Sequence, residues 1–176
     1  MLKHGTFLQL AEDAIEICEA GKKLLLRGYM ITGRDAALPR LVELIREDKL
    51  TEHGIDLKGA VIFHTAVSGA GIGPTSSNKH DIESTMVELS KAGVKMHIGK
   101  GKLKDETIAE LGKYGAVFAV TPPLSALLTS SIVSQRVLAF PELGMEALHL
   151  LEVKDFPVII VAANGKSLDS GYCGKG

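Results

Sequence analysis

The stretch from Ser68 to Asp81 has a composition suited to binding an anion. Its sequence, SGAGIGPTSSNKHD, combines glycines with hydroxyl side chains, an amide and a lysine. Glycine lets the backbone approach a ligand closely, and hydroxyl and ammonium groups donate hydrogen bonds to an oxyanion. The apolar run Ala60–Phe63 precedes the stretch, and Asp81 is placed to cap a following helix. A strand, a glycine-rich loop and a helix start in succession favour a carboxylate or phosphate site.

Cations follow two other predicted strands of the chain. Arg34 comes after the strand 23–31, and Lys100 lies between two glycines after the strand 94–98. The carboxyl ends of strands in an open α/β sheet gather at one edge. We therefore expect Arg34, Lys79 and Lys100 to converge, and together they would bind a dianion better than any one of them alone.

Two nucleotide-binding motifs are weak or absent. The glycines at 69, 71 and 73 begin a dinucleotide fingerprint, but Pro74 stands where its third glycine belongs. No acidic residue closes the next strand, where such a site needs one to bind the ribose. A Walker loop is excluded, because no Gly-Lys-Thr or Gly-Lys-Ser follows a suitable glycine spacing. A stand-alone phosphate- or nucleotide-binding α/β domain remains a lesser alternative.

The metal-binding residue types are scattered. Cys18 and Cys173 are far apart in sequence and form no CxxC pair, so they predict no cysteine-held zinc or iron–sulfur site within one chain. His64, His80 and His97 fall near the same predicted edge without a ligand spacing such as HxxxH. Packing or hydrogen bonding is the commoner role for isolated histidines. We therefore predict that the chain itself holds no metal.

Length, charge and hydropathy favour a single domain and argue against a nucleic-acid-binding, membrane-spanning or secreted protein. A chain of 176 residues is a reasonable size for a single domain, 1–176. A formal net charge of −1 with scattered lysines and arginines argues against nucleic-acid binding. No apolar run is long enough to cross a bilayer, and the first residues lack the features of a signal peptide. Together with the two lone cysteines, these features predict a cytoplasmic protein with reduced thiols, and a single disulfide is a lesser alternative.

Strand-like and helix-like patterns alternate along the chain, so the predicted class is α/β. The glycine-rich tail, about 168–176, is expected to be loose. The predicted helices cover 8–18, 35–45, 81–92 and 107–111, and the predicted strands cover 23–31, 59–64, 94–98, 116–120, 132–140, 148–153 and 158–162.

Five short motifs occur in an order that resembles a known family. They are Ile31–Ala37, Val61–His64, Gly73–Ser77, Gly99–Gly101, and Glu142–Ala147 with Val153–Pro157. This chain resembles the β subunit, or C-terminal domain, of class I iron–sulfur hydro-lyases, the family of fumarase and L-tartrate dehydratase. The resemblance covers residues 14–165.

The resemblance implies a swivelling β/β/α domain with a mixed sheet and short flanking helices. It also implies a partner α subunit, or an N-terminal domain, that holds a [4Fe–4S] cluster through three cysteines. The reaction would be the reversible dehydration of a small hydroxy dicarboxylate of the malate/fumarate or tartrate type. The chain would be inactive without that partner, and both a homodimer and a heterotetramer are compatible with this assignment.

The motifs also imply roles for individual residues. By position, Arg34 matches the family arginine that grips a substrate carboxylate, and Thr75 matches the threonine proposed as the catalytic base. Ser76 matches the neighbouring hydroxyl residue, and Lys100 matches the lysine of the family's KG motif. Lys79 stands where the family usually has arginine. All except Thr75 are expected to bind substrate.

Several positions near the expected site depart from the family pattern. Lys79 lacks the planar guanidinium of arginine, so bidentate carboxylate binding is lost there. His80 replaces the usual methionine, and Leu38 replaces a common histidine. These departures favour, as an alternative, a diverged or non-catalytic domain that binds a dicarboxylate.

Overall fold

The computed structural model describes residues 21–167, except 22, 69–70, 76–78 and 123–124. At 71–75, 79–82 and 125 it describes the backbone alone. The predicted helix 8–18 and the tail 168–176 lie outside the described residues. The elements are β1 (Lys23–Thr32), α2 (Leu38–Arg46), η1 (Thr51–His53), β2 (Val61–Phe63), β3 (Thr65–Ser68), β4 (Gly71–Thr75), α3 (Lys79–Lys91), β5 (Met96–Gly99), α4 (Asp105–Lys113), β6 (Val117–Val120), α5 (Ser125–Ser130), β7 (Ile132–Ala139), η2 (Pro141–Glu146), β8 (Leu148–Ala163) and β9 (Lys166–Ser167).

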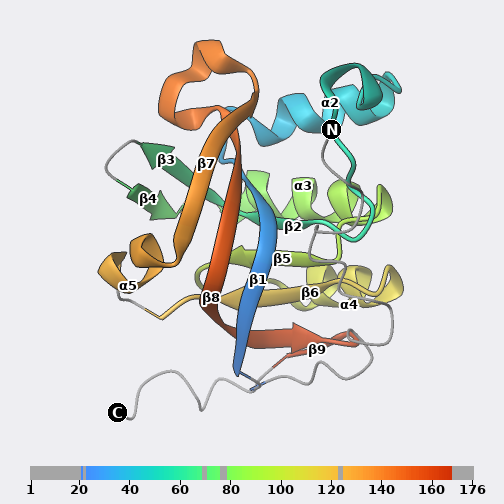
Figure 1. Ribbon diagram of the computed structural model, residues 1–176. Coiled ribbons are helices and arrows are strands. Elements are labelled where there is room, and N and C mark those ends of the chain that lie inside the picture. The colour runs from blue at the N-terminus through green and yellow to red at the C-terminus, as the bar shows by residue number, and fades with distance from the viewer. Residues whose placement is uncertain (1–20, 22, 69–70, 76–78, 123–124, 168–176) are drawn as a thin grey trace.

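The main sheet is mixed and curls back onto its first strand. β1, β2, β5 and β6 are neighbours in that order and run parallel. β8 runs antiparallel to β6 and pairs with β1 as well, so the hydrogen-bonded path returns to where it began. Figure 1 shows β1 and β8 crossing in front of β2, β5 and β6. The α/β class and the mixed sheet predicted from the sequence are confirmed.

The curled sheet encloses an aliphatic core. Phe63 of β2 and Phe156 of β8 meet edge to face inside it, with their ring centroids 5.7 Å apart. Burial of this apolar surface is the main stabilising term of the fold. The buried residues of this cluster are Leu26, Met30, Val61, Phe63, Val67, Met96, Ile98, Val117, Ala119, Leu128, Leu151, Val153, Phe156, Val158, Ile160 and Ala163.

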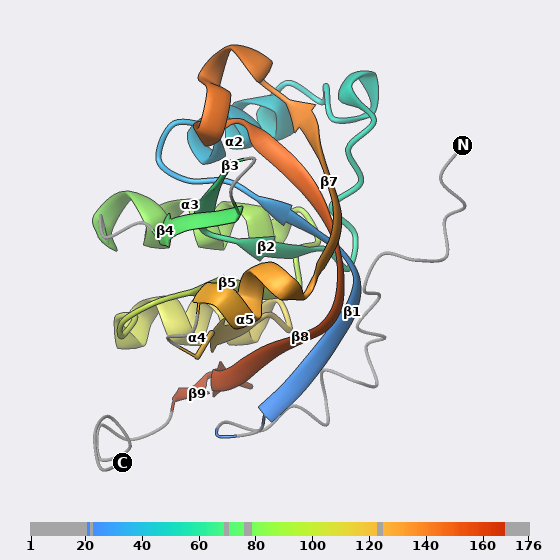
Figure 2. The same cartoon turned by 60° about the vertical axis from the view of Figure 1, so that its left-hand side comes forward.

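Helices cover the other face of the parallel strands, as Figure 2 shows for α2, α3 and α4. α2 buries Leu38, Leu41 and Val42, and Pro39 lies in its first turn as predicted. Glu83 of α3 accepts hydrogen bonds from the Lys104 backbone amide at 2.9 Å and from the Thr107 hydroxyl at 3.1 Å. Glu83 therefore satisfies amide and hydroxyl groups at the start of α4, where no side chain of the helix's own N-cap does so.

The predicted break between strands 148–153 and 158–162 is wrong, because β8 is one strand of 16 residues. The register against β1 shifts between Leu26 and Gly28, so β8 carries a bulge around Asp155. Asp155 has a left-handed φ of 54° at that point. The turn-like residues around Asp155 are accommodated in the bulge, so the strand does not end there. Pairing with β1 resumes beyond the bulge, where Pro157 lies opposite Leu25.

The stretch from Ser68 to Asp81 is also more regular than predicted. β3 and β4 form a two-stranded antiparallel hairpin, with Val67 opposite Ile72. The following helix, α3, begins at Lys79, so the prediction of Asp81 as its cap is wrong. The backbone of Asp81 lies within the first turn of α3 instead.

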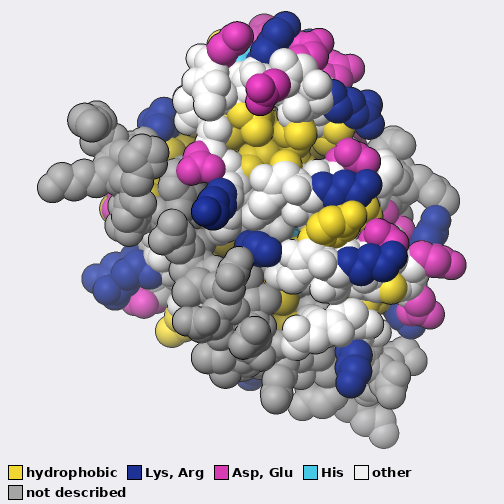
Figure 3. All heavy atoms as spheres, turned by 90° about the vertical axis from the view of Figure 1, so that its right-hand side faces the viewer, with side chains coloured by type: hydrophobic (Ala, Val, Ile, Leu, Met, Phe, Trp, Pro, Cys, Tyr) yellow, Lys and Arg dark blue, Asp and Glu magenta, His cyan; other side chains and the backbone are white. Residues whose placement is uncertain are grey.

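On the face that Figure 3 shows, basic and acidic side chains are interspersed. None of the helices in the described part of the chain is long and apolar enough to span a membrane.

Candidate anion site at the carboxyl edge of the sheet

The parallel strands end level with one another. Thr32 at the end of β1 lies opposite Phe63 at the end of β2, and Phe63 lies opposite Ile98 of β5. Gly99 of β5 lies opposite Val120 of β6. The segments that follow these four strands therefore all start from one edge of the sheet. We call this the carboxyl edge, and its alignment confirms the expected gathering of strand ends.

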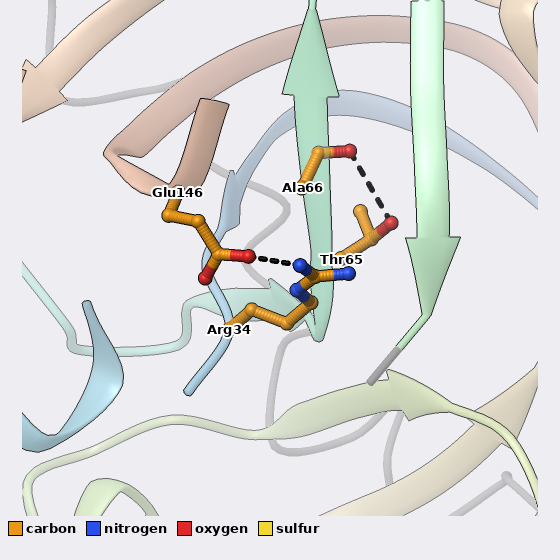
Figure 4. A network of polar contacts seen from close by, with 4 residues as sticks. All are labelled: Arg34, Thr65, Ala66 and Glu146. Carbon is orange, nitrogen blue, oxygen red and sulfur yellow. Dashed lines mark hydrogen bonds and ion pairs between the residues drawn. The ribbon is translucent and has the colours of Figure 1, made fainter. Parts of the chain in front are cut away.

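Arg34 lies at the carboxyl edge directly after β1. The Gly33 amide donates a hydrogen bond to the Phe63 carbonyl at 3.1 Å, which ties this segment to the end of β2. The guanidinium pairs with the carboxylate of Glu146 in η2, and each side chain keeps about a quarter of its surface exposed, 26% and 27%. Figure 4 shows the two side chains meeting beside β3, which contacts both β1 and η2.

Lys100 lies at the same edge, directly after β5, and its side chain is exposed. β2 separates β5 from β1, so Lys100 and Arg34 follow strands that are two apart in the sheet. The backbone therefore places two of the three predicted cations after strand ends at the same edge.

The other predicted site residues belong to the hairpin and the start of α3. β3 leaves the carboxyl edge at Thr65 and β4 returns to it, because Thr75 ends β4 opposite Thr65. Lys79 begins α3 four positions later, and four residues span at most about 14 Å. The backbone of Thr75 and Lys79 thus lies at or near the edge, whereas their side chains and Ser76 lie outside the described parts of the structure.

A buried chain of hydrogen bonds lies behind the edge. His64 follows β2, and its Nε2 lies 3.1 Å from Nδ1 of His97 on β5. Nε2 of His97 lies 2.9 Å from the Ser90 hydroxyl of α3, which donates a hydrogen bond to the Met86 carbonyl at 2.7 Å. Burial lowers the pKa of His64 to about 3, and burial together with the charge of His64 lowers the pKa of His97 well below its usual value.

The sequence matches the family described as Fumarase C-terminus over residues 4–170. The chain belongs to this family. The match confirms the resemblance to class I iron–sulfur hydro-lyases that the five motifs carried.

Individual members of the Fumarase C-terminus family differ in how much of their length this chain spans. The L(+)-tartrate dehydratase subunit beta of Escherichia coli K12 is 31% identical over 86% of this chain and 78% of its own length. The anaerobic class I fumarate hydratase of the same strain is 30% identical over 79% of this chain. Fumarate hydratase 2 of Leishmania major is 28% identical over 80% of this chain. The chain spans 26% of the length of each of these two fumarate hydratases.

The donor set at the edge of this Fumarase C-terminus chain suits an anion better than a metal cluster. Among the described residues, no three His, Cys, Asp or Glu side chains gather as metal ligands. Cys18 and Cys173 lie outside that part of the chain. The described groups at the edge are the Arg34 guanidinium with the Glu146 carboxylate beside it, the Lys100 ammonium and a hydroxyl, and a neutral imidazole lies behind them. The cationic and hydroxyl groups are hydrogen-bond donors that suit an anion.

Two residues of the edge were missed as site residues from sequence. Glu146 belongs to the motif Glu142–Ala147, which pointed to the family but not to a contact 112 positions away in sequence. Thr65 is buried opposite Thr75, in a hairpin whose residues from Ser68 onward are predicted as a loop from the sequence. Thr65 and Val67, two β-branched residues at alternate positions, were the available signal for β3.

Proposed function

We propose that this chain is the β subunit of an iron–sulfur-dependent hydro-lyase that reversibly dehydrates a small hydroxy dicarboxylate of the malate/fumarate or tartrate type. The observation that carries the proposal is the position of Arg34 and Lys100 at one edge of the sheet, in a chain related to a tartrate dehydratase β subunit along most of both lengths. The [4Fe–4S] cluster belongs to a partner α subunit in this proposal. When bound there, it supplies a Lewis acid.

The residues of this chain bind and orient the acid. A dicarboxylate carries two negative charges, and cations at separate strand ends hold both of its ends in one orientation. Arg34 takes one carboxylate, while Lys100, Lys79 and Ser76 contribute donors around the other. Glu146 holds the Arg34 guanidinium at the edge before substrate arrives.

Thr75 is the proposed base that removes the carbon-bound proton. A hydroxyl is a weak base at its ordinary pKa, so its activation needs a neighbouring cation or a site closed to water. The return of β4 to the carboxyl edge supports this role, because it brings the Thr75 backbone opposite Thr65.

Replacing Arg34 tests the role of the carboxyl edge. In an anaerobically purified complex with the α subunit, Arg34→Ala should lower kcat/KM by at least about a hundredfold, because the loss of a charged hydrogen-bonding partner costs about 3 kcal/mol. Arg34→Lys should recover only part of the activity, because it lacks the bidentate fork. Arg46→Ala, an exposed change at the end of α2, is the matched control. A wild-type rate for Arg34→Ala would remove Arg34 from the site.

A second candidate is a diverged domain that binds a dicarboxylate without catalysing its dehydration. The presence of Lys79 and His80 where the family has arginine and methionine favours it. Calorimetric titration of the isolated chain with malate, tartrate and ATP distinguishes the candidates. Tight dicarboxylate binding without any partner supports the second candidate, and a response to ATP alone supports a nucleotide-binding domain.

A further inference from the structure

The hydrogen-bond chain behind the carboxyl edge has one consistent arrangement of protons. The Ser90 hydroxyl has a single proton and donates it to the Met86 carbonyl, which can only accept. The contact between Ser90 and His97 therefore uses the Nε2 proton of His97. Since a neutral imidazole carries one proton, Nδ1 of His97 is an acceptor.

The same reasoning determines the tautomer of His64. Because Nδ1 of His97 accepts, Nε2 of His64 must carry the proton that joins the two rings. Nδ1 of His64 is then a bare lone pair. Both rings are buried and neutral, since burial lowers both pKa values far below 7.

This lone pair has no hydrogen-bond partner in the described part of the chain, although the atom is buried. The hydroxyl oxygen of Thr32 is in the same condition. Thr32 ends β1 opposite Phe63, the residue that precedes His64. A buried polar atom without a partner costs about 1–3 kcal/mol, so these two atoms at adjacent strand ends favour a bound partner, either an ordered water or a group of a ligand.

We propose that His64 is a further ligand-binding residue of the carboxyl edge, and that its Nδ1 accepts the proton of a hydroxyl group on the bound acid. The inference rests on the proposed function. A hydroxy dicarboxylate at neutral pH has carboxylate oxygens that only accept, so its hydroxyl is its only donor. An imidazole nitrogen without a proton attracts that hydroxyl and repels a carboxylate oxygen.

His64 thus complements Arg34 in recognising the acid. The guanidinium selects carboxylates, and the imidazole selects the hydroxyl without using the lone pairs of the hydroxyl oxygen. His97 and Ser90 act as positioning residues, because they set the tautomer that His64 presents. This arrangement discriminates between hydroxylated dicarboxylates and those without a hydroxyl.

Nitrogen-15 NMR of the wild-type chain tests the tautomer without any substitution. With labelled histidines, Nδ1 of His64 should give the shift of an unprotonated nitrogen from pH 8 to pH 6, and Nε2 that of a protonated one. Ser90→Ala removes the hydroxyl oxygen that accepts the His97 proton. The substitution should therefore introduce the opposite tautomer at His97 and at His64. A protonated Nδ1 in the wild-type protein would overturn the proposal.

Ligand selectivity tests the role in recognition. In the complex with the α subunit, His64→Phe should weaken the binding of malate or tartrate about tenfold and leave succinate, which has no hydroxyl, unchanged. His53→Phe, an exposed change in η1, is the control and should alter neither. Equal weakening of malate and succinate, or of neither, would overturn the inference while leaving the proposed function intact. If none of these acids binds the wild-type complex, the proposed function itself fails and takes this inference with it.

Discussion

At and behind the carboxyl edge, side chains that are far apart in the sequence contact each other in pairs. The sequence predicts Arg34 as a site residue from its place after a strand, but its partner Glu146 lies 112 positions away. The histidine pair was expected to serve packing or hydrogen bonding, and its connection through Ser90 is a property of how α3 packs on β2 and β5. The residue types and their places after strands predict which cations lie at the edge. The contact that orients Arg34 is seen only in the structure, because it joins distant parts of the sequence.

The Glu146 pair gives a prediction at this scale. Glu146→Ala should lower kcat/KM of the assembled enzyme about tenfold, because the Arg34 guanidinium loses the carboxylate that orients it. Glu142→Ala is a close control, since Glu142 lies in the same η2 segment and pairs with Arg40 in a more exposed setting, at 58% and 44% exposure. Hydrogen bonds from its own amide and from Arg40 lower the pKa of Glu142. Equal effects of the two substitutions would contradict a special role for Glu146.

The buried histidines predict a pH dependence of stability. In the unfolded chain a histidine takes up a proton below about pH 6.5, whereas native His64, with its pKa lowered to about 3 by burial, stays neutral. Stability is therefore fully present above pH 6.5 and is lost as the pH falls toward 3, by about 1.4 kcal/mol per pH unit for this group.

Urea unfolding from pH 7 to pH 4 measures this dependence. His64→Gln should reduce the slope of the free energy of unfolding against pH by about 1.4 kcal/mol per unit below pH 5.5. His53→Gln, at an exposed position, should keep the wild-type slope. An unchanged slope in His64→Gln would mean that His64 is protonated in the native protein.

At the scale of elements, most helices and strands were predicted from the sequence, with two exceptions. The strand β8 is longer than predicted, and the hairpin of β3 and β4 was not predicted. Asp155 and Pro157 resemble a turn, yet tertiary pairing with β1 carries β8 through them as a bulge. The glycines after Ser68 resemble a loop, yet β3 and β4 pair there as a hairpin. Local patterns carry no information on pairing with distant strands, which decides both cases.

Glu83 links two helices and gives a prediction at this scale. Glu83→Ala should lower the free energy of unfolding by about 2 kcal/mol, because it leaves the Lys104 amide and the Thr107 hydroxyl without their acceptor. Glu106→Ala, an exposed change in the first turn of α4, should cost less than about 0.5 kcal/mol. Chemical denaturation measures both, and a similar small loss for Glu83→Ala would show that α4 does not depend on it.

At the scale of the molecule, the parallel register of β1, β2, β5 and β6 places the ends of these strands at the carboxyl edge. The pairing of β8 with both β1 and β6 closes the sheet, and the helices then cover its outer face. In the proposed enzyme, the cations and the buried neutral acceptors of the carboxyl edge recognise the small acid, and the partner α subunit brings the cluster to this edge.

Reconstitution with the partner tests this account most directly. The purified chain, a cluster-bearing α subunit and their mixture would be assayed anaerobically for dehydration of malate and of tartrate. The account predicts no turnover by either chain alone and turnover of at least one of these acids by the mixture. A stable, cluster-loaded mixture that dehydrates neither acid, or turnover by the α subunit alone at the full rate, would contradict it.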